Sequence, residues 1–324
     1  MITQLKELRS HKGFIALVSA RFISNLGNGL SPIALAYGVL SIPGADGKDL
    51  SLVMAARFVP MVALMLFGGV VGDRYKRNRV VGGADIIGSV FVGSGWALLI
   101  DAISFLIAGI LVWNLDLPEM PEREENSVIH DLRIGWHEFI SRPWVIAIVC
   151  SFAIINMCFE AIWQVLGPLA YDQGDSGPRN WSFNLAAVTL GMIFGSVIAL
   201  KIKLKRPLVT SMILIAASSV WNFAIASTQP LALVMVCGFV SGLAIDIFMV
   251  QWNTAMQTHI PEESFSRVAA YDAFGSFGIA PIGVAFAGPA AAYFGITPTL
   301  WATGILTFIA ALASLSVKSL RALK

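Results

Sequence analysis

The order of apolar and polar residues divides the chain into long apolar segments separated by short polar stretches. Turn-forming residues stand between several of them, at Pro43-Gly44, Gln229-Pro230 and Pro261. Eight segments are close to the roughly 20 residues that an α-helix needs to cross a bilayer: residues 14–40, 50–72, 144–170, 182–200, 207–227, 231–253, 267–293 and 296–317. The pattern predicts an all-α membrane protein, a bundle of spanning helices.

Residues 80–113 are apolar throughout, too long for one span and short for two. The positive-inside rule, by which Lys and Arg gather on the cytoplasmic side, decides between the two arrangements. With the N-terminus inside and two crossings, 18 of the 22 Lys and Arg residues fall inside and two outside; with one crossing the numbers become 8 and 12. We therefore predict about ten spans with both termini in the cytoplasm, although the crossing from Val80 to Gly93 measures only about 21 Å.

The polar stretch 114–143 is the longest between the apolar segments. It begins acidic and then becomes amphipathic, with apolar residues at helical spacing, namely Ile129, Leu132, Trp136, Phe139 and Ile140. This spacing predicts a helix that lies at the membrane surface or against the bundle. We divide the chain accordingly into a transmembrane part over 1–113, a cytoplasmic linker over 114–143 and a six-span part over 144–324.

Composition agrees with a membrane protein: 56% of residues are hydrophobic and 13% are charged, whereas a soluble domain carries about 25% charged residues. Arg21 interrupts the first apolar stretch, which argues against a cleaved signal peptide there. The three cysteines lie inside apolar runs, and the four histidines are scattered without metal-ligand spacing. Nucleotide-binding, hydrolase and metalloprotease motifs are absent from the sequence. We expect no enzyme activity, no cofactor, no metal and no nucleic-acid partner.

Five charges crowd into the seven residues from Asp73 to Arg79, directly after an apolar run. The spacing Gly69-x-x-x-Asp73-Arg74-x-x-Arg77-x-Arg79 resembles the loop signature of the major facilitator superfamily. Further stretches resemble its siderophore and macrolide exporter branch: AARFVP at 55–60, GWALLIDAISFL at 95–106, VLGPLA at 165–170, LKRPL at 204–208 and the long run at 257–289. Lys76 and Asn78 depart from the broader signature.

The resemblance implies a fold of two six-span halves, whereas the first part of this chain has room for only four spans. VVGGADII, similar to the start of the family's third span, is followed almost directly by GSVFVGSGW, similar to the end of its fifth. The family's fourth span, which lines the substrate cavity and carries an arginine that partners the loop signature, is thus missing. We expect a major-facilitator-like bundle of 4 + 6 helices with a shortened N-terminal half.

The function that the resemblance implies is secondary active export of small amphipathic molecules, drug-like or siderophore-like, by alternating access. Without a nucleotide motif, uphill transport would draw on an ion gradient, most plausibly of protons, as an antiporter does. The expected partners are the lipid bilayer of the cell inner (plasma) membrane, a small-molecule substrate and protons. The alternative is a membrane protein that does not transport, either a deletion remnant or a binding partner, because the fourth span is absent.

Two hypotheses explain the loop residues, which are Gly69, Asp73, Arg74, Arg77 and Arg79. A basic cluster after a span is commonly a topology anchor. The second hypothesis is that the loop forms a gate. Gly69 lets a neighbouring helix approach closely, and Asp73 can lie against a helix N-terminus, where an anion is stabilised. In the family, that helix corresponds to the one that begins near Ser264 here, with Arg77 in reach of Asp272.

Charges inside spans are costly and therefore indicate function. Depth along the predicted helices pairs Arg21 with Asp246 and Arg57 with Glu160, either as static ion pairs or as coupling residues. Four amide side chains would either face a cavity or form hydrogen bonds between helices: Asn25, Asn28, Asn156 and Gln164. Asp101 and Asp272 are placed near span ends, as capping or interfacial residues. A run of glycines and prolines predicts one bendable, closely packed span, through Gly275, Gly278, Pro281, Gly283, Gly288 and Pro289.

Overall fold

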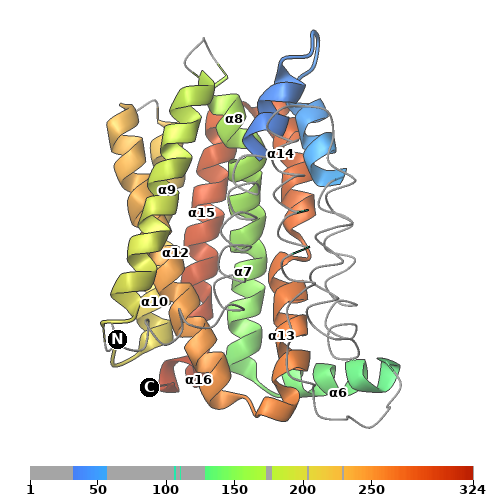
Figure 1. Cartoon of the computed structure of the whole chain (residues 1–324), viewed down its shortest axis with the longest axis vertical. Helices are drawn as coiled ribbons and strands as arrows, with labels where there is room; N and C mark the ends of the chain where they lie inside the picture. Colours follow the sequence, from blue (N-terminus) through green and yellow to red (C-terminus); the bar gives the residue numbers. More distant parts are fainter. Residues whose placement is uncertain are drawn as a thin grey trace. The chain divides into compact units, whose positions relative to one another are not determined.

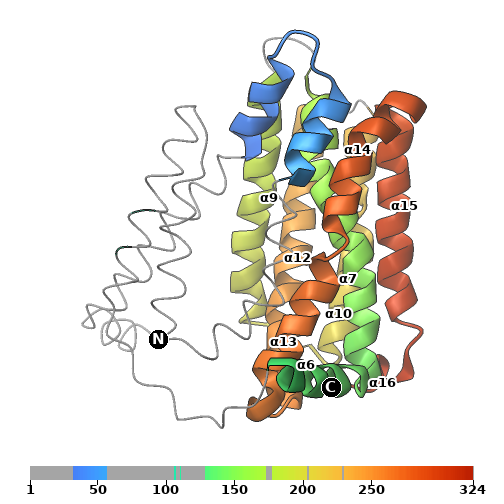
Figure 2. The same ribbon diagram turned by 90° about the vertical axis from the view of Figure 1, so that its right-hand side faces the viewer.

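The computed structural model describes residues 32–56, 106, 110, 128–172, 177–202, 204–227 and 230–323 (Figures 1 and 2). Contacts group the chain into two compact units, Met1–Gly38 with Phe67–Asn126 and Val39–Leu66 with Ser127–Lys324. Nearly all described residues belong to the second unit, to which the following account refers. The domain limits predicted at 113 and 143 stay predictions.

The described residues form helices and connections, with no strand among them. Residues 32–40 and 47–56 are helical. The helices that follow are α6 (Val128–Ile140), α7 (Pro143–Ala161), the π-helix η1 (Ile162–Leu166), α8 (Gly167–Ala170), α9 (Gly177–Ala199), α10 (Pro207–Ser218), α11 (Val220–Ala226), α12 (Leu231–His259), α13 (Glu262–Phe277), α14 (Ala280–Phe294), α15 (Ile296–Ser314) and α16 (Lys318–Ala322).

Six helical segments of the described chain are long and apolar enough to cross a membrane: Pro143–Ala170, Gly177–Ala199, Pro207–Ala226, Leu231–His259, Ser264–Phe294 and Ile296–Ser314. They coincide with the six spans predicted after the linker, to within a few residues at most ends. The first four predicted spans lie largely outside the described residues, so the total of ten stays a prediction.

Prolines set several helix boundaries, as the sequence predicted. Pro230 and Pro261 stand immediately before α12 and α13, because proline lacks the N–H that a helix interior requires. After the helix at 32–40, the chain turns through Gly44, whose φ of 87° favours glycine. The next helix begins with a capping box: Asp46 Oδ1 accepts the backbone N–H of Lys48 at 2.7 Å, and Asp49 Oδ2 accepts that of Asp46 at 3.0 Å.

α9 and α12 form the most extensive helix pair of the unit, side by side along their lengths (Figure 1). A Cβ at Gly191 would collide with the carbonyl oxygen of Phe239, and one at Gly242 with that of Val188. Gly195 and Gly238 extend the same contact. Two small-xxx-small motifs, one on each helix, therefore bring the two backbones together, as in many membrane helix pairs.

The outer surfaces of α9, α12 and α14 carry large apolar side chains that a water-soluble protein would bury. Leu190, Ile193, Val236 and Phe286 are all about half exposed or more. Large apolar side chains exposed in this number agree with helices that face lipid.

The amphipathic helix predicted in the linker is present as α6, which lies across one end of the bundle, near the start of α13 (Figure 2). Its Phe139 is buried, whereas Trp136 and Ile140 are exposed. The rings of Trp136 and Phe139 lie 5.5 and 5.9 Å from that of Tyr271 on α13. α6 therefore contacts the bundle at Tyr271, and its place relative to the membrane surface stays a prediction.

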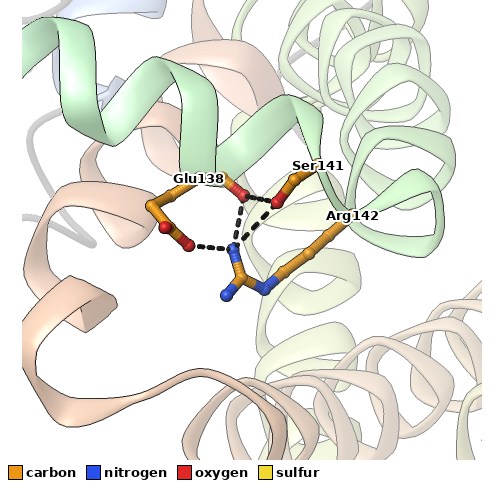
Figure 3. A network of polar contacts seen from close by, with 3 residues as sticks. All are labelled: Glu138, Ser141 and Arg142. Atoms are coloured by element: carbon orange, nitrogen blue, oxygen red, sulfur yellow. Dashed lines mark hydrogen bonds and ion pairs between the residues drawn. The ribbon is translucent and has the colours of Figure 1, made fainter.

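A small network of hydrogen bonds and one ion pair lies at the junction of α6 and α7 (Figure 3). Arg142 turns back over the last turn of α6, pairs with Glu138 Oε2 at 2.7 Å and donates to the backbone carbonyl of Glu138. Ser141 Oγ donates to the same carbonyl at 2.8 Å. These bonds satisfy a helix-end carbonyl and fix the direction in which α7 leaves α6.

Candidate functional site

The fifth predicted span is interrupted two-thirds of the way along its length. α7 gives way to the π-helix η1, where the Gly167 N–H bonds the carbonyl of Ile162, five residues back. Pro168 follows and has no N–H to offer the carbonyl of Gln164. Short π-helical turns of this kind occur frequently at functional sites.

A second interruption divides the predicted bendable span into α13 and α14. α13 ends at Phe277, and α14 begins at Ala280. Pro281 has no N–H with which to bond the carbonyl of Phe277. The span predicted to be bendable is thus interrupted at Gly278 and Ile279.

Asn156 on α7 stabilises this break. Its Nδ2 donates to the backbone carbonyl of Ser276 at 2.9 Å. The carbonyl lies in the last turn of α13, where helix carbonyls lose their usual partners. For Asn156, the structure therefore supports the helix-to-helix hydrogen bond rather than a free cavity group.

Glu160 and Gln164 come together at the π-helix. Gln164 Nε2 donates to Glu160 Oε2 at 2.7 Å, and Gln164 is buried. Their separation of four residues places them on one helix face. The sequence singled out both residues without pairing them, although the spacing alone could have done so.

Asp272 occupies a different environment from the one expected. It lies eight residues inside the segment Ser264–Phe294, about 12 Å along the helix. Trp252 Nε1 on α12 donates to its Oδ2 at 3.0 Å, and Ser276 Oγ donates to its Oδ1 at 3.2 Å. Asp272 therefore does not cap the start of its helix, because α13 begins at Glu262 rather than at the predicted 267. The interfacial role stays a prediction.

Asp246 faces α9 from the middle of α12. Ser196 Oγ donates to Asp246 Oδ2. The close approach at Gly195, where an added Cβ would lie 3.1 Å from the Asp246 Cβ, lets the two groups meet. The predicted partner, Arg21, lies outside the described residues, so their pairing stays a prediction.

The other predicted site residues also lie outside the described part of the chain. They are the loop residues Gly69, Asp73, Arg74, Arg77 and Arg79, the arginine Arg57, and the amides Asn25 and Asn28. The proposed gate and the Arg57–Glu160 pair accordingly stay predictions.

Pairs of aromatic rings connect α7 to α12. The rings of Phe152 and Phe248 stack at 4.2 Å, and those of Trp144 and Trp252 meet edge to face at 5.5 Å. Trp252 is only 4% exposed, so its N–H reaches Asp272 from a largely apolar setting. Sequence reasoning missed Trp252, because its pairing depends on how α12 is rotated against α13.

Helices long and apolar enough to cross a membrane, with a few carboxylates and amides inside them, define a multi-pass membrane protein. The family model of the Major Facilitator Superfamily matches residues 83–271, more than half of the chain. The protein belongs to this superfamily, whose members are transporters. Among curated proteins, no sequence matches significantly.

Proposed function

We propose that the protein is a secondary active transporter that exports small amphipathic molecules, drug-like or siderophore-like, by proton-driven alternating access. It would act in the cell inner (plasma) membrane as an antiporter, with both termini in the cytoplasm. The observation that carries the proposal is the superfamily match over residues 83–271.

Two features of the described helices support transport. Glu160, Asp246 and Asp272 are carboxylates inside candidate spans, where an acidic group is costly and marks an ion or substrate path. The interruptions at η1 and at Gly278 give two adjacent spans places at which to bend. A static anchor would need neither.

Protons are the coupling ion that these groups suit. Carboxylates bind and release protons, and no nucleotide-binding motif occurs in the sequence. Under this proposal, Glu160 or Asp246 exchanges protons, and Asp73 latches the cytoplasmic side near Ser264. Replacing a coupling acid by its amide should abolish gradient-driven export while folded protein remains. If the acids only neutralise arginines, the same change should lower protein levels instead.

Ethidium and macrolide efflux from a pump-deficient host tests the proposal. The chain should be compared with a version that carries a homologous segment in place of the missing spans. We expect the chain to lower accumulation of at least one probe, with the difference abolished by an uncoupler. Export by the filled version alone would support the alternative, a membrane protein that has lost transport.

A further inference from the structure

The Asp272 carboxylate accepts hydrogen bonds through both of its oxygens, and one of the two bonds connects α13 to α12. Oδ2 accepts Trp252 Nε1 of α12 at 3.0 Å, and Oδ1 accepts Ser276 Oγ of its own helix at 3.2 Å. Both partners are neutral donors, and neither brings a positive charge. Hydrogen bonds to an ionised acceptor are about twice as strong as those between neutral groups, so the charged carboxylate holds α13 firmly to α12.

The same side chain lies next to the break in its span. Ser276 bonds Asp272 through its hydroxyl and Asn156 of α7 through its carbonyl. Gly278 and Ile279, where the helix is interrupted, follow two and three residues later. A change at the carboxylate is therefore transmitted directly to the point where α13 can bend against α14.

We propose that Asp272 is a proton-binding residue whose protonation releases α13 from α12 and lets α13 turn at Gly278. The inference rests on the proposed function and adds Asp272 to Glu160 and Asp246 as an acid that couples export to protons. A proton bonds to one carboxylate oxygen, and no other bond is made or broken covalently. The resulting hydroxyl must donate, so the two charge-assisted bonds become weaker neutral ones until the proton leaves on the other side.

Other titratable groups lie on the helices that contact α13. Those described are Arg133, His137 and Glu138 on α6, Cys150, Cys158 and Glu160 on α7, Cys237, Asp246 and His259 on α12, and Arg267 and Tyr271 on α13 itself. His259 is connected to the site through aromatic rings, since its ring lies 6.0 Å from Trp144 and Trp144 lies 5.5 Å from Trp252. His259 is therefore the histidine to remove in a control variant.

Hydrogen–deuterium exchange of the protein in nanodiscs tests the release without a substrate. The measured quantity is exchange in α13 peptides divided by exchange in α15 peptides, which removes the chemical effect of pH. For the wild type, we expect this ratio to rise about tenfold from alkaline to acidic pH, the loss expected for a hydrogen bond to a charged group. In Asp272→Asn, the ratio should be high and the same at both values.

Two matched variants separate Asp272 from its neighbours. Asp246→Asn changes another acid of the membrane interior, and His259→Gln removes the histidine; both should keep the pH response of α13. Trp252→Phe keeps a ring but removes the donor, so its ratio should already be raised at alkaline pH, which tests the proposal even where Asp272→Asn does not fold. A pH-independent wild type, a response that survives in Asp272→Asn or one lost in His259→Gln would overturn it.

Ethidium transport in proteoliposomes distinguishes this inference from the proposed function. Asp272→Asn should lose export driven by a pH gradient and keep downhill ethidium exchange. Gradient-driven export equal to that of the wild type would overturn the coupling role while leaving the transporter intact. A wild type that moves no ethidium or macrolide contradicts the proposed function, and the α13 response then still decides whether Asp272 binds the proton.

Discussion

Two helix contacts within the same unit are built differently. α9 and α12 meet backbone to backbone at glycines on both helices, with no interruption in either helix. α7 and the α13–α14 span share one such approach, at Gly283, where an added Cβ would collide with the carbonyl oxygen of Met157, but each of them is interrupted, at η1 and at Gly278. The first contact has little room to change along its length, whereas the break in the second is held by individual hydrogen bonds that can be exchanged.

The difference follows from what each contact loses when it moves. Gly191 and Gly242 each lie against a carbonyl of the other helix, so any sliding drives a backbone atom into another. At the break in α13–α14, the bond from Asn156 to Ser276 and those around Asp272 can be lost one at a time. We therefore assign the first pair a scaffold role and the second a moving role.

The largest expected effect is in cysteine labelling, which shows on which side of the membrane each connection between helices lies. A position should label either fully or not at all. Single cysteines in a cysteine-free background at Asp175 and Gln229, before α9 and α12, should react with an impermeant reagent added outside the cell. Those at Asn126 and Lys205 should not, because the Lys and Arg count places them in the cytoplasm. Outside labelling at Lys205 would reverse the direction of α9 and contradict the ten-span topology.

The scaffold contact should be intolerant of a single methyl group. Gly242→Ala places a Cβ against the carbonyl of Val188, and overpacking of this kind costs about 1–3 kcal/mol or more. Thermal unfolding of the purified protein should shift clearly downward. Gly38→Ala is the control, because nothing in the described part of the chain lies within 4 Å of a Cβ there. Equal unfolding temperatures in the two variants would show that α9 and α12 can move apart at little cost in free energy.

The sequence predicted the spans of this unit well because each depends on local information. Apolar length and the prolines at 230 and 261 define where helices lie and begin. The glycines and prolines likewise marked the span in which the interruption at Gly278 lies. The paired motifs Gly191-xxx-Gly195 and Gly238-xxx-Gly242 could also have been recognised, since small residues four apart mark close helix contacts.

The site was predicted less completely because it depends on helix rotation. Asn156 and Gln164 were selected as polar residues in apolar runs, but their partners follow only from the folded structure. Asp272 and Trp252 are 20 residues apart and on different helices, so no spacing rule connects them. The π-helix at Ile162–Leu166 has only Pro168 as a sequence signal, and that residue also fits an ordinary helix end.

The hydrogen bond that bridges the moving pair should matter less than the scaffold glycines, but more than a surface amide. Asn156→Leu leaves the Ser276 carbonyl without this donor, at a cost of about 1–3 kcal/mol. Unfolding temperature and exchange in α13 peptides measure the effect. Asn253→Leu serves as the control, because exposed Asn253 bonds only the carbonyl of Met249 in its own helix among its described contacts. If Asn156→Leu and Asn253→Leu gave the same unfolding temperature and the same exchange in α13, Asn156 would not stabilise the break.

The smallest effect is expected where the break is made more regular. Pro281→Ala supplies an N–H that can bond the carbonyl of Phe277 and so continue α13 into α14, at a gain of about 0.5–1.5 kcal/mol. Folded protein should remain, while exchange at residues 276–283 and the rate of ethidium efflux should both fall. Pro289→Ala, inside α14, should leave the exchange at 276–283 unchanged. A faster transporter with Pro281→Ala would argue against bending at this position.

The division into scaffold and moving pair is tested most directly by distances between spin labels at acidic and alkaline pH. One pair joins Leu190 of α9 to Val236 of α12, and the other joins Cys150 of α7 to Ile282 of α14, all of them exposed positions. We predict that the first distance distribution stays the same at both pH values and that the second shifts. Equal shifts in both pairs, or a shift only between Leu190 and Val236, would contradict the account.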